Sequence, residues 1–277
     1  MSPTKGRTGT REWSDHSVNC CLGCRHACLY CYARELALRR FRKITKGEDW
    51  SNERIDADAL AWILAVGDRR HKGRVMFPTQ HDITAGNSRV CMAVLVRLLA
   101  AGNDVLVVSK AGLHVPTLLY AARALAGIPD RSPGQLELRV TLTCLDRDIS
   151  AFWEPGAPPP QERLDAIALA RQLDIPVSVA IEPLLEPSRI LDLVNETQLH
   201  GARGEIWIGA ANQLRARTAW CANRPCLGEE VRRIEAGQTP AKMREVFDLV
   251  PKYPTIRWKD SFQGVLGIDA FGKCLSA

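Results

Sequence analysis

Three closely spaced cysteines are the residues of this sequence with the clearest capacity for chemistry. Cys24, Cys28 and Cys31 form a C-x3-C-x2-C pattern on a short glycine-containing loop, ahead of an Ala/Leu-rich stretch. This tight spacing allows one loop to wrap a single metal centre, and three thiolates suit an iron-sulfur cubane. Because a cubane has four irons, one iron keeps no protein ligand and stays open to a small molecule. The motif therefore predicts a catalytic metal centre.

A structural zinc site is the alternative for the same cysteines. Zinc in such sites takes a closed set of four ligands, and His26, Cys20 or Cys21 could supply the fourth. We expect no disulfides, since the sequence shows no secretory signal. Packing as small apolar side chains is the simplest expectation for the cysteines outside the motif, although Cys221 and Cys226 could hold an auxiliary cluster with Cys274. The sequence leaves six cysteines without an assigned role: Cys20, Cys21, Cys91, Cys221, Cys226 and Cys274.

The elements that must position this loop follow an alternating β/α pattern. Short β-branched or apolar runs alternate with longer amphipathic stretches, several of which open with proline. This pattern predicts an α/β fold: a partial (β/α)6-type TIM barrel with a parallel sheet of six or seven strands, and the cysteine loop after the first strand. The expected strands are 17–19, 75–77, 105–109, 138–143, 177–181, 205–208 and 255–258, and the expected helices are 88–99, 116–125, 160–173, 187–195 and 240–249.

Polar residues follow the predicted strands at their carboxyl ends, where barrel enzymes assemble their active sites. His81 and Asp82 follow the second strand, and such a pair could bind ribose, act as acid and base, or simply cap the loop. Glu182 follows the fifth strand and could bind a ribose or the substrate, with an ion pair to Arg163 as the alternative. Gly209 is expected to let the backbone approach a ligand closely.

The cysteine loop resembles that of the radical S-adenosylmethionine (radical SAM) superfamily, in which C-x3-C-x2-C followed by an aromatic residue holds a 4Fe-4S cluster. The resemblance implies that S-adenosylmethionine binds the open iron and that an external one-electron donor drives its cleavage to a 5′-deoxyadenosyl radical. The cofactors then carry the difficult chemistry, while the protein positions the substrate and shields the radical.

A closer resemblance, from Cys20 to Lys259, is to the spore photoproduct lyase branch, including phage-associated relatives. It rests on residues 24–32 with Tyr30 and Tyr32, on 75–82 ending in Asp82, on 107–110, and on the Glu154-Pro155-Gly156 segment with the helix that follows.

This closer resemblance implies roles for individual residues. Lys110 and Thr141 would lie near the carboxylate of the cofactor, with Ser109, Glu182 and Gly209 also on the cofactor side. Tyr30 and Tyr32 would lie beside the cluster. One residue departs from the family: Thr79 stands where the lyase has a hydrogen-donating cysteine, and Cys144 could replace that cysteine.

The charge pattern permits a polyanionic partner. Lys and Arg number 37 against 31 Asp and Glu, and the basic residues gather near 5–11, 39–46, 69–74 and 215–233. Solvated helix faces would give the same pattern. We expect a basic N-terminal extension at 1–15, the partial barrel at 16–262 and a C-terminal extension at 263–277. Since no apolar run reaches membrane-spanning length, we expect a cytoplasmic protein without a membrane partner, in the host cytoplasm if a phage encodes it.

The sequence thus predicts a radical SAM enzyme of isomerase or lyase type that acts on a modified thymine-type base in DNA. The reaction would be isomerisation or hypermodification of a thymine adduct, or reversal of a lesion. One alternative keeps the cluster but assigns a tRNA, peptide or small-molecule substrate. The other is a zinc-stabilised nucleic-acid-binding module without catalysis.

Overall fold

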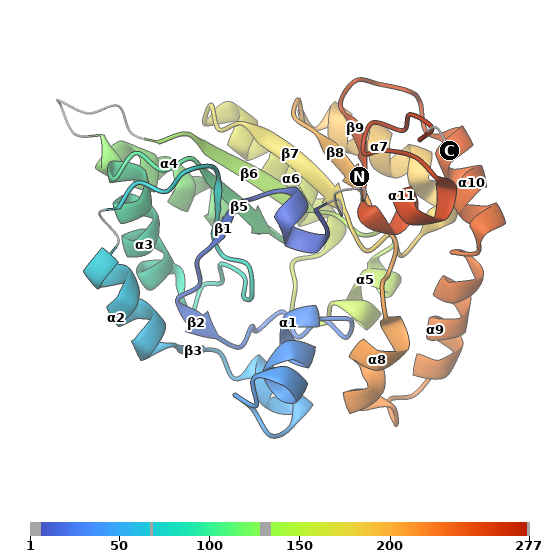
Figure 1. Cartoon of the computed structure of the whole chain (residues 1–277), viewed down its shortest axis with the longest axis horizontal. Helices are drawn as coiled ribbons and strands as arrows, with labels where there is room; N and C mark the ends of the chain where they lie inside the picture. Colours follow the sequence, from blue (N-terminus) through green and yellow to red (C-terminus); the bar gives the residue numbers. More distant parts are fainter. Residues whose placement is uncertain (1–6, 67–68, 128–133, 276–277) are drawn as a thin grey trace, which may run out of the picture.

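Seven parallel strands form one curled sheet, an open half-barrel (Figure 1). The computed structural model describes residues 7–66, 69–127 and 134–275. The sheet order is β1-β4-β5-β6-β7-β8-β9, so each strand added along the chain lies beside the previous one. This confirms the predicted partial barrel. The strands are β1 His16–Ser17, β4 Val75–Met76, β5 Val105–Ser109, β6 Leu136–Thr141, β7 Val177–Ile181, β8 Ile206–Ile208 and β9 Ile256–Trp258.

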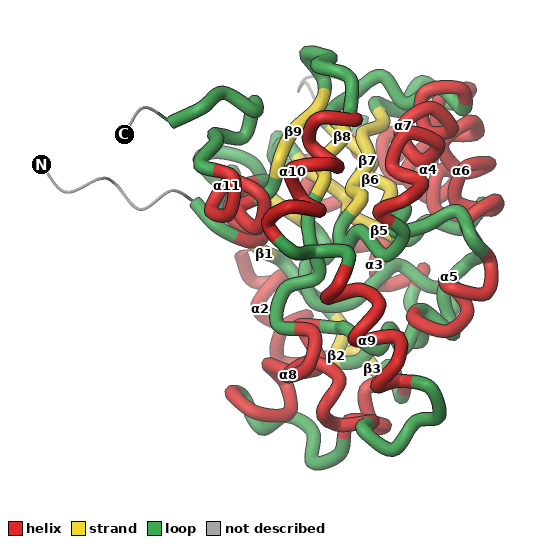
Figure 2. Tube along the Cα trace, turned by 90° about the vertical axis from the view of Figure 1, so that its right-hand side faces the viewer, coloured by secondary structure: helices red, strands yellow, loops and turns green. Residues whose placement is uncertain are grey.

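Helices cover the outer face of the sheet, which explains why the central strands are largely buried. All five residues of β7 are buried, as are Leu138 and Val140 on the neighbouring β6 and Val105 on β5. Figure 2 shows α4, α6 and α7 packed along one side of the strands. The covering helices are α3 Ser88–Ala100, α4 His114–Ala126, α6 Pro160–Gln172, α7 Ile190–Leu199 and α10 Pro240–Leu249, close to the predicted ranges. A 3-10 turn, Pro187–Arg189, precedes α7.

A second group of short elements lies beyond the carboxyl ends of the strands, in the lower half of Figure 1. It contains a two-stranded antiparallel sheet and several helices that the sequence patterns did not predict. Only the start of the Ala/Leu-rich stretch is α-helical, and the chain continues there as a π-helix, Leu36–Arg40. The elements are β2 Cys21–Leu22, β3 Arg54–Ile55, α1 Tyr32–Glu35, α2 Ala57–Val66, α5 Arg147–Trp153, α8 Leu214–Thr218 and α9 Leu227–Ala236, with 3-10 turns at Gly47–Ser51 and Ala219–Cys221.

Aromatic and charged side chains fill the inside of the half-barrel below the rim. The buried Arg139 guanidinium lies 5.0 Å from the ring of Trp13 and 5.6 Å from that of Trp207. Trp13 follows a 3-10 turn, Gly9–Glu12, and the side chain of Glu12 pairs with Lys259 at the end of β9. Residues 9–13 therefore close the interior from one side, which leaves the carboxyl-end rim as the accessible part of the barrel.

The last described residues lie close to the same strand, where the Trp258 amide donates to the Ala270 carbonyl at 2.9 Å. Helix α11, Asp260–Leu266, follows β9, and Ile268 pairs with Cys274 through an isolated antiparallel bridge. The expected limits of the barrel at residues 16 and 262 stay predictions. Among the described residues, no helix has the length and apolar character needed to span a bilayer.

Candidate functional site

The loop that carries the three motif cysteines lies between β2 and α1. Gly23 enters it with φ +90°, and a Cβ there would come within 2.7 Å of the Trp50 carbonyl oxygen. The Cys24 amide donates to that same oxygen at 2.8 Å. At the other end, Cys31 is the N-cap of α1, and its sulfur accepts from the amide of Arg34 at 3.5 Å. Local backbone geometry thus fixes both ends of the loop.

The segment after α5 holds the middle of this loop. The Leu29 amide donates to the Trp153 carbonyl at 2.8 Å, and the Gly156 amide donates to the His26 carbonyl at 3.0 Å. A Cβ on Gly156 would lie 2.1 Å from the carbonyl oxygen of Arg25, so only glycine permits this approach. The Glu-Pro-Gly segment singled out in the sequence is therefore the support on which the cysteine loop rests.

The three cysteines are close enough to interact electrostatically and are shielded from solvent. Cys24 and Cys28 are buried and Cys31 is half-buried. Burial raises the pKa of Cys28 to about 11, against the opposing effect of Lys110, and burial raises the pKa of Cys24 as well. Bringing three thiolates together here consequently requires nearby positive charge or a bound metal.

Two cations, the buried Arg34 and the half-buried Lys110, provide positive charge at this loop. Arg34 is 1% exposed, interacts electrostatically with all three motif cysteines and donates to the Cys28 carbonyl at 3.1 Å. Its guanidinium stacks on Trp220 at 3.9 Å, and its Nε has no hydrogen-bond partner among the described residues. Lys110 also interacts electrostatically with the Cys28 thiol. An anionic iron-sulfur cluster bound by three thiolates fits this setting.

A buried polar network connects Tyr30 of the loop to the sheet. The Tyr30 hydroxyl donates to Glu154, which also accepts from Thr143 at 3.0 Å and pairs with Arg163. Lys110 completes the network, with its Nζ 4.0 Å from Glu154 and 5.5 Å from the centre of the Tyr30 ring. Burial opposes ionisation of Glu154, but Arg163 and Lys110 outweigh it and lower the pKa of this carboxyl.

Asp82 organises a second part of the rim. Its carboxylate accepts from the Ser109 hydroxyl and, at 2.9 Å, from the Lys110 amide, and His26 Nδ1 of the cysteine loop lies 3.1 Å away. Burial raises the pKa of Asp82, but His26, Lys110 and Ser109 outweigh that effect, so the pKa lies well below its usual range. Asp82 therefore joins the ends of β4 and β5 to the cysteine loop as a carboxylate.

The third part of the rim contains Glu182. The sequence predicts that this carboxylate binds either a ligand, such as a ribose or the substrate, or the side chain of Arg163. Its Oε2 lies 3.6 Å from Nζ of Lys259. The expected alternative, an ion pair with Arg163, is wrong because Arg163 is engaged by Glu154. A Cβ on Gly209 would come within 2.8 Å of Lys259 and 2.9 Å of Glu182. Glycine at this position thus makes room for the Glu182–Lys259 pair.

The other predicted site residues lie around the same loop, with different surroundings. The Tyr32 hydroxyl donates to the Thr79 carbonyl, while the Thr79 hydroxyl accepts from Asn19 at 2.7 Å. The Thr141 carbonyl, at the end of β6, accepts from Arg163 at 3.2 Å. Cys144 is buried in an apolar cluster that also contains Cys28. Burial raises the pKa of Cys144 to about 12.

His81 and Asp82 are neighbours in sequence but make different contacts. His81 Nδ1 lies 3.0 Å from the Asp82 backbone carbonyl, not from its carboxylate, and Nε2 lies 3.8 Å from the sulfur of Cys20. Cys20 in turn contacts Cys21 and Cys91. Two of the three candidates for a fourth zinc ligand at the motif therefore belong to another cluster.

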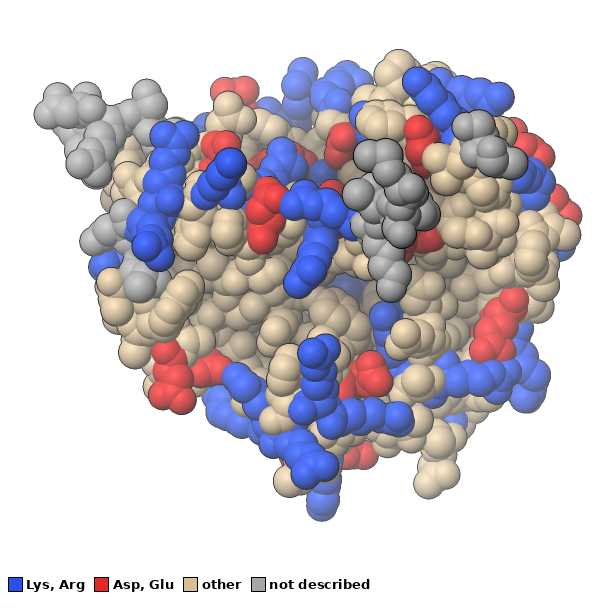
Figure 3. Space-filling view, in the orientation of Figure 1, with Lys and Arg blue, Asp and Glu red and all other residues tan. Residues whose placement is uncertain are grey.

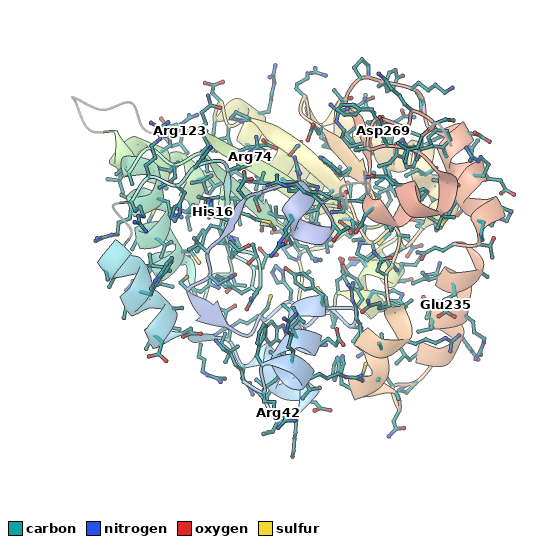
Figure 4. The ribbon with its side chains drawn as sticks, in the orientation of Figure 1. His16, Arg42, Arg74, Arg123, Glu235 and Asp269 are labelled. Atoms are coloured by element: carbon teal, nitrogen blue, oxygen red, sulfur yellow. The ribbon has the colours of Figure 1, made fainter. Side chains whose placement is uncertain are left out.

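The basic groups of the sequence lie on different sides of the molecule. Figure 3 shows Lys and Arg above and below a recessed, mostly uncharged centre of this face. Figure 4 places Arg42 below α1, beyond the cysteine loop. Arg74 lies in the upper half of the same view and directly precedes the amino end of β4. The first group is Arg39, Arg40, Arg42, Lys43 and Lys46, all exposed. In the second group, Arg69, Arg70 and Lys72 are exposed and Arg74 is half-buried. Of the basic residues near 5–11, Lys5 lies outside the described residues.

Sequence reasoning missed Arg34, a buried cation that donates to the carbonyl of Cys28. No local signal marks it, because it stands beside Glu35 in a short helix, where charged residues are usually exposed. The sequence offers His26 only as a possible zinc ligand and Lys259 only as a possible substrate contact, whereas the structure places them beside Asp82 and Glu182.

The fold and the rim together define a half-barrel whose carboxyl-end loops carry the polar groups, and solved structures share this fold. A structure of spore photoproduct lyase complexed with dinucleoside spore photoproduct matches with a TM-score of 0.55 at 14% identity, over 93% of this chain and 79% of that one. Another, with bound AdoMet (S-adenosylmethionine) and dinucleoside spore photoproduct, gives a TM-score of 0.53 over the same shares. At this identity the similarity establishes the fold alone.

Curated relatives are more similar in sequence but have no described activity. An uncharacterised protein of Acidianus two-tailed virus is 25% identical over 194 residues, which is 67% of this chain and 62% of that protein. An uncharacterised protein of Mycobacterium bovis is 26% identical over 176 residues, 61% of this chain and 49% of that protein. The chain thus spans less than two thirds of the length of either relative. No protein-family model matches it.

Proposed function

We propose that this protein is a radical SAM enzyme. The observation that carries the proposal is the C-x3-C-x2-C loop at the carboxyl-end rim of a parallel half-barrel, flanked by the buried Arg34 and the half-buried Lys110. In such a site Cys24, Cys28 and Cys31 hold a 4Fe-4S cluster, which with S-adenosylmethionine and an external electron donor supplies a 5′-deoxyadenosyl radical.

The rim residues would bind the cofactor on three sides. Lys110, whose pKa lies above its usual range although burial opposes its charge, offers a permanent cation to the carboxylate of the methionyl group. Ser109 already donates to Asp82, so it would act by orienting that carboxylate. Glu182 is held by Lys259 and remains 23% exposed, which suits a contact with ribose hydroxyls.

We propose DNA carrying a modified thymine-type base as the substrate. Two observations support this: the same fold binds a dinucleoside lesion in spore photoproduct lyase, and five exposed cations follow α1. A duplex substrate requires extrusion of the base, at a cost of a few kcal/mol, with phosphates held by flanking Arg and Lys.

Thr79 and Cys144 differ in their ability to donate a hydrogen atom, which bears on whether the reaction is lesion reversal or isomerisation. The hydroxyl of Thr79 has too strong an O–H bond to give its hydrogen to a carbon radical, whereas Cys144 keeps its S–H hydrogen at neutral pH because its pKa is about 12. Lesion reversal would therefore depend on Cys144, while an isomerisation that regenerates the adenosyl radical would need no thiol.

The direct test is anaerobic incubation of the iron-loaded protein with reductant, S-adenosylmethionine and candidate DNA, followed by mass analysis of nucleosides. We expect a changed thymine-type nucleoside, formed without stoichiometric consumption of S-adenosylmethionine if the reaction is an isomerisation. Formation of 5′-deoxyadenosine while every DNA nucleoside stays unchanged would contradict the DNA assignment. The absence of both 5′-deoxyadenosine and any changed nucleoside would contradict the enzyme assignment itself.

Replacing Lys110 by methionine is expected to weaken cofactor binding and leave iron loading intact. A charged hydrogen bond contributes about 1.5–3 kcal/mol, so the Kd for S-adenosylmethionine should rise about tenfold or more. Equilibrium binding to the loaded protein and iron analysis measure the two effects. The exposed Lys252, replaced in the same way, is the matched control. Equal affinities of the two variants would remove Lys110 from the cofactor site.

Replacing Arg39, Arg42 and Lys46 together by glutamine is expected to weaken DNA binding. Each cation that no longer neutralises a phosphate reduces the slope of log K against log salt by about 0.9, so the triple variant should reduce it by about 2.7. Titration of DNA at several salt concentrations measures this slope. The control carries glutamine at Arg69, Arg70 and Lys72, three exposed cations of the second basic group. If both variants lose affinity equally, the partner is attracted by net charge and not by this surface.

A further inference from the structure

Three thiols and one imidazole meet in the core, outside the motif. Cys20 and Cys21 precede the motif loop, His81 follows β4, and Cys91 lies on α3. The sulfur of Cys20 is 3.8 Å from that of Cys21, 3.9 Å from that of Cys91 and 3.8 Å from Nε2 of His81. The exposed fraction of each of the four residues is 7% or less.

The distances from the Cys20 sulfur match those of a tetrahedral zinc site, while Cys91 approaches the group through Cys20 and lies farther from at least one of the other two ligand atoms. Zinc binds sulfur at about 2.3 Å, and the edge of a tetrahedron is about 1.63 times that bond, so ligand sulfurs lie about 3.8 Å apart. The ligand atoms of Cys20, Cys21 and His81 all lie within 4.8 Å of one another, the one such group among the described residues. The sulfurs of Cys24, Cys28 and Cys31 do not form a group of this kind.

The orientation of His81 is the second observation that points to a metal. Its Nδ1 lies 3.0 Å from the Asp82 carbonyl oxygen, so Nδ1 carries the proton and Nε2 keeps a lone pair. Metal-binding histidines are commonly oriented in this way by a backbone carbonyl. The lone pair is directed towards Cys20, whose amide donates to Nε2 at 3.2 Å, a hydrogen bond that zinc binding would replace.

We propose that Cys20, Cys21, Cys91 and His81 bind a structural Zn²⁺ ion. Binding displaces the thiol protons and joins three segments: the chain leading into the motif loop, the carboxyl end of β4 and helix α3. In this assignment His81 is a ligand and not an acid or base. An entry route exists, since Cys21 also lines an open cavity of about 240 Å³ together with Asn19 and Gln80. The proposal does not depend on the proposed radical chemistry.

The test uses the full chain with Cys24, Cys28 and Cys31 replaced by alanine, so that the motif binds no metal. Titration with Co²⁺ followed by Zn²⁺ should show about one ion per chain, with the visible absorption of tetrahedral cobalt bound to thiolates, and displacement of cobalt by zinc. Zinc should also accompany the unaltered protein in about one equivalent when it is purified from zinc-containing medium.

Two further variants identify the ligands. Cys91→Ser and His81→Gln should each weaken zinc binding at least tenfold and alter the cobalt spectrum, while circular dichroism checks that they fold. The control, Cys221→Ser with Cys226→Ser, should bind as tightly as its parent. Failure to bind zinc or cobalt, spectra unaffected by the two ligand variants, iron in place of zinc, or a disulfide between Cys20 and Cys91 under reducing conditions would each overturn the proposal.

Discussion

Replacing Cys28 by alanine is expected to abolish iron-sulfur loading of the motif. A cubane held by three thiolates loses one of its three protein bonds, and the buried position of Cys28 offers no water-accessible substitute. Iron and sulfide should fall from about four of each per chain to near zero, and the brown visible absorption should vanish. Chemical analysis after anaerobic reconstitution gives both numbers.

The matched control for this prediction is Cys144→Ala. Cys144 is a buried thiol in the same apolar cluster as Cys28, so its removal creates a comparable packing defect without touching the motif. Its iron and sulfide content should equal that of the unaltered protein. A Cys28→Ala variant that still takes up a full cluster would show that the motif is not the iron site, and the radical SAM assignment would fall with it.

Replacing Glu154 by glutamine is expected to destabilise the protein strongly. Glu154 and Arg163 have fully buried side chains that form an ion pair, and Lys110 and Tyr30 depend on the same carboxylate. Removal of one partner of a buried pair leaves an uncompensated charge, which typically costs about 3–5 kcal/mol. Urea unfolding followed by circular dichroism measures the loss.

An exposed ion pair provides the control for Glu154. Glu235 pairs with Arg215, and Arg215 is largely exposed, so Glu235→Gln should change the free energy of unfolding by only about 0–1 kcal/mol. Equal effects of the two substitutions would mean that the Glu154 network contributes nothing beyond a surface pair.

Glu154→Gln should also change how the free energy of unfolding depends on pH in the acidic range. Arg163 and Lys110 lower the pKa of Glu154 in the folded protein, against the effect of burial, from its ordinary value of 4.5. The ionised carboxylate therefore stabilises the fold above that value, and this contribution is lost as the pH falls through the folded-state pKa. Asp82 acts in the same direction. Glu154→Gln should flatten the loss of stability below about pH 4.5, which unfolding curves at several pH values measure.

Local sequence alone determined the sheet and the cysteine loop. Hydrophobic runs and the regular spacing of amphipathic stretches predicted all seven parallel strands of the barrel, and the tight cysteine spacing predicted one loop carrying all three thiols. The polar residues at the rim followed from topology, since parallel strands present their carboxyl ends at one edge. The two-residue strands β2 and β3 escaped prediction, because strands so short have no detectable period. Helix α2 was not predicted either.

Only the tertiary structure decided which polar groups meet. Sequence left Glu182 with Arg163 as a possible partner, but folding pairs Glu182 with Lys259 and Arg163 with Glu154. Folding likewise brings Cys91 next to Cys20, 71 residues away in the chain. Periodicity specifies which face of an element is buried, but the partner of a buried charge or thiol depends on how distant elements pack together.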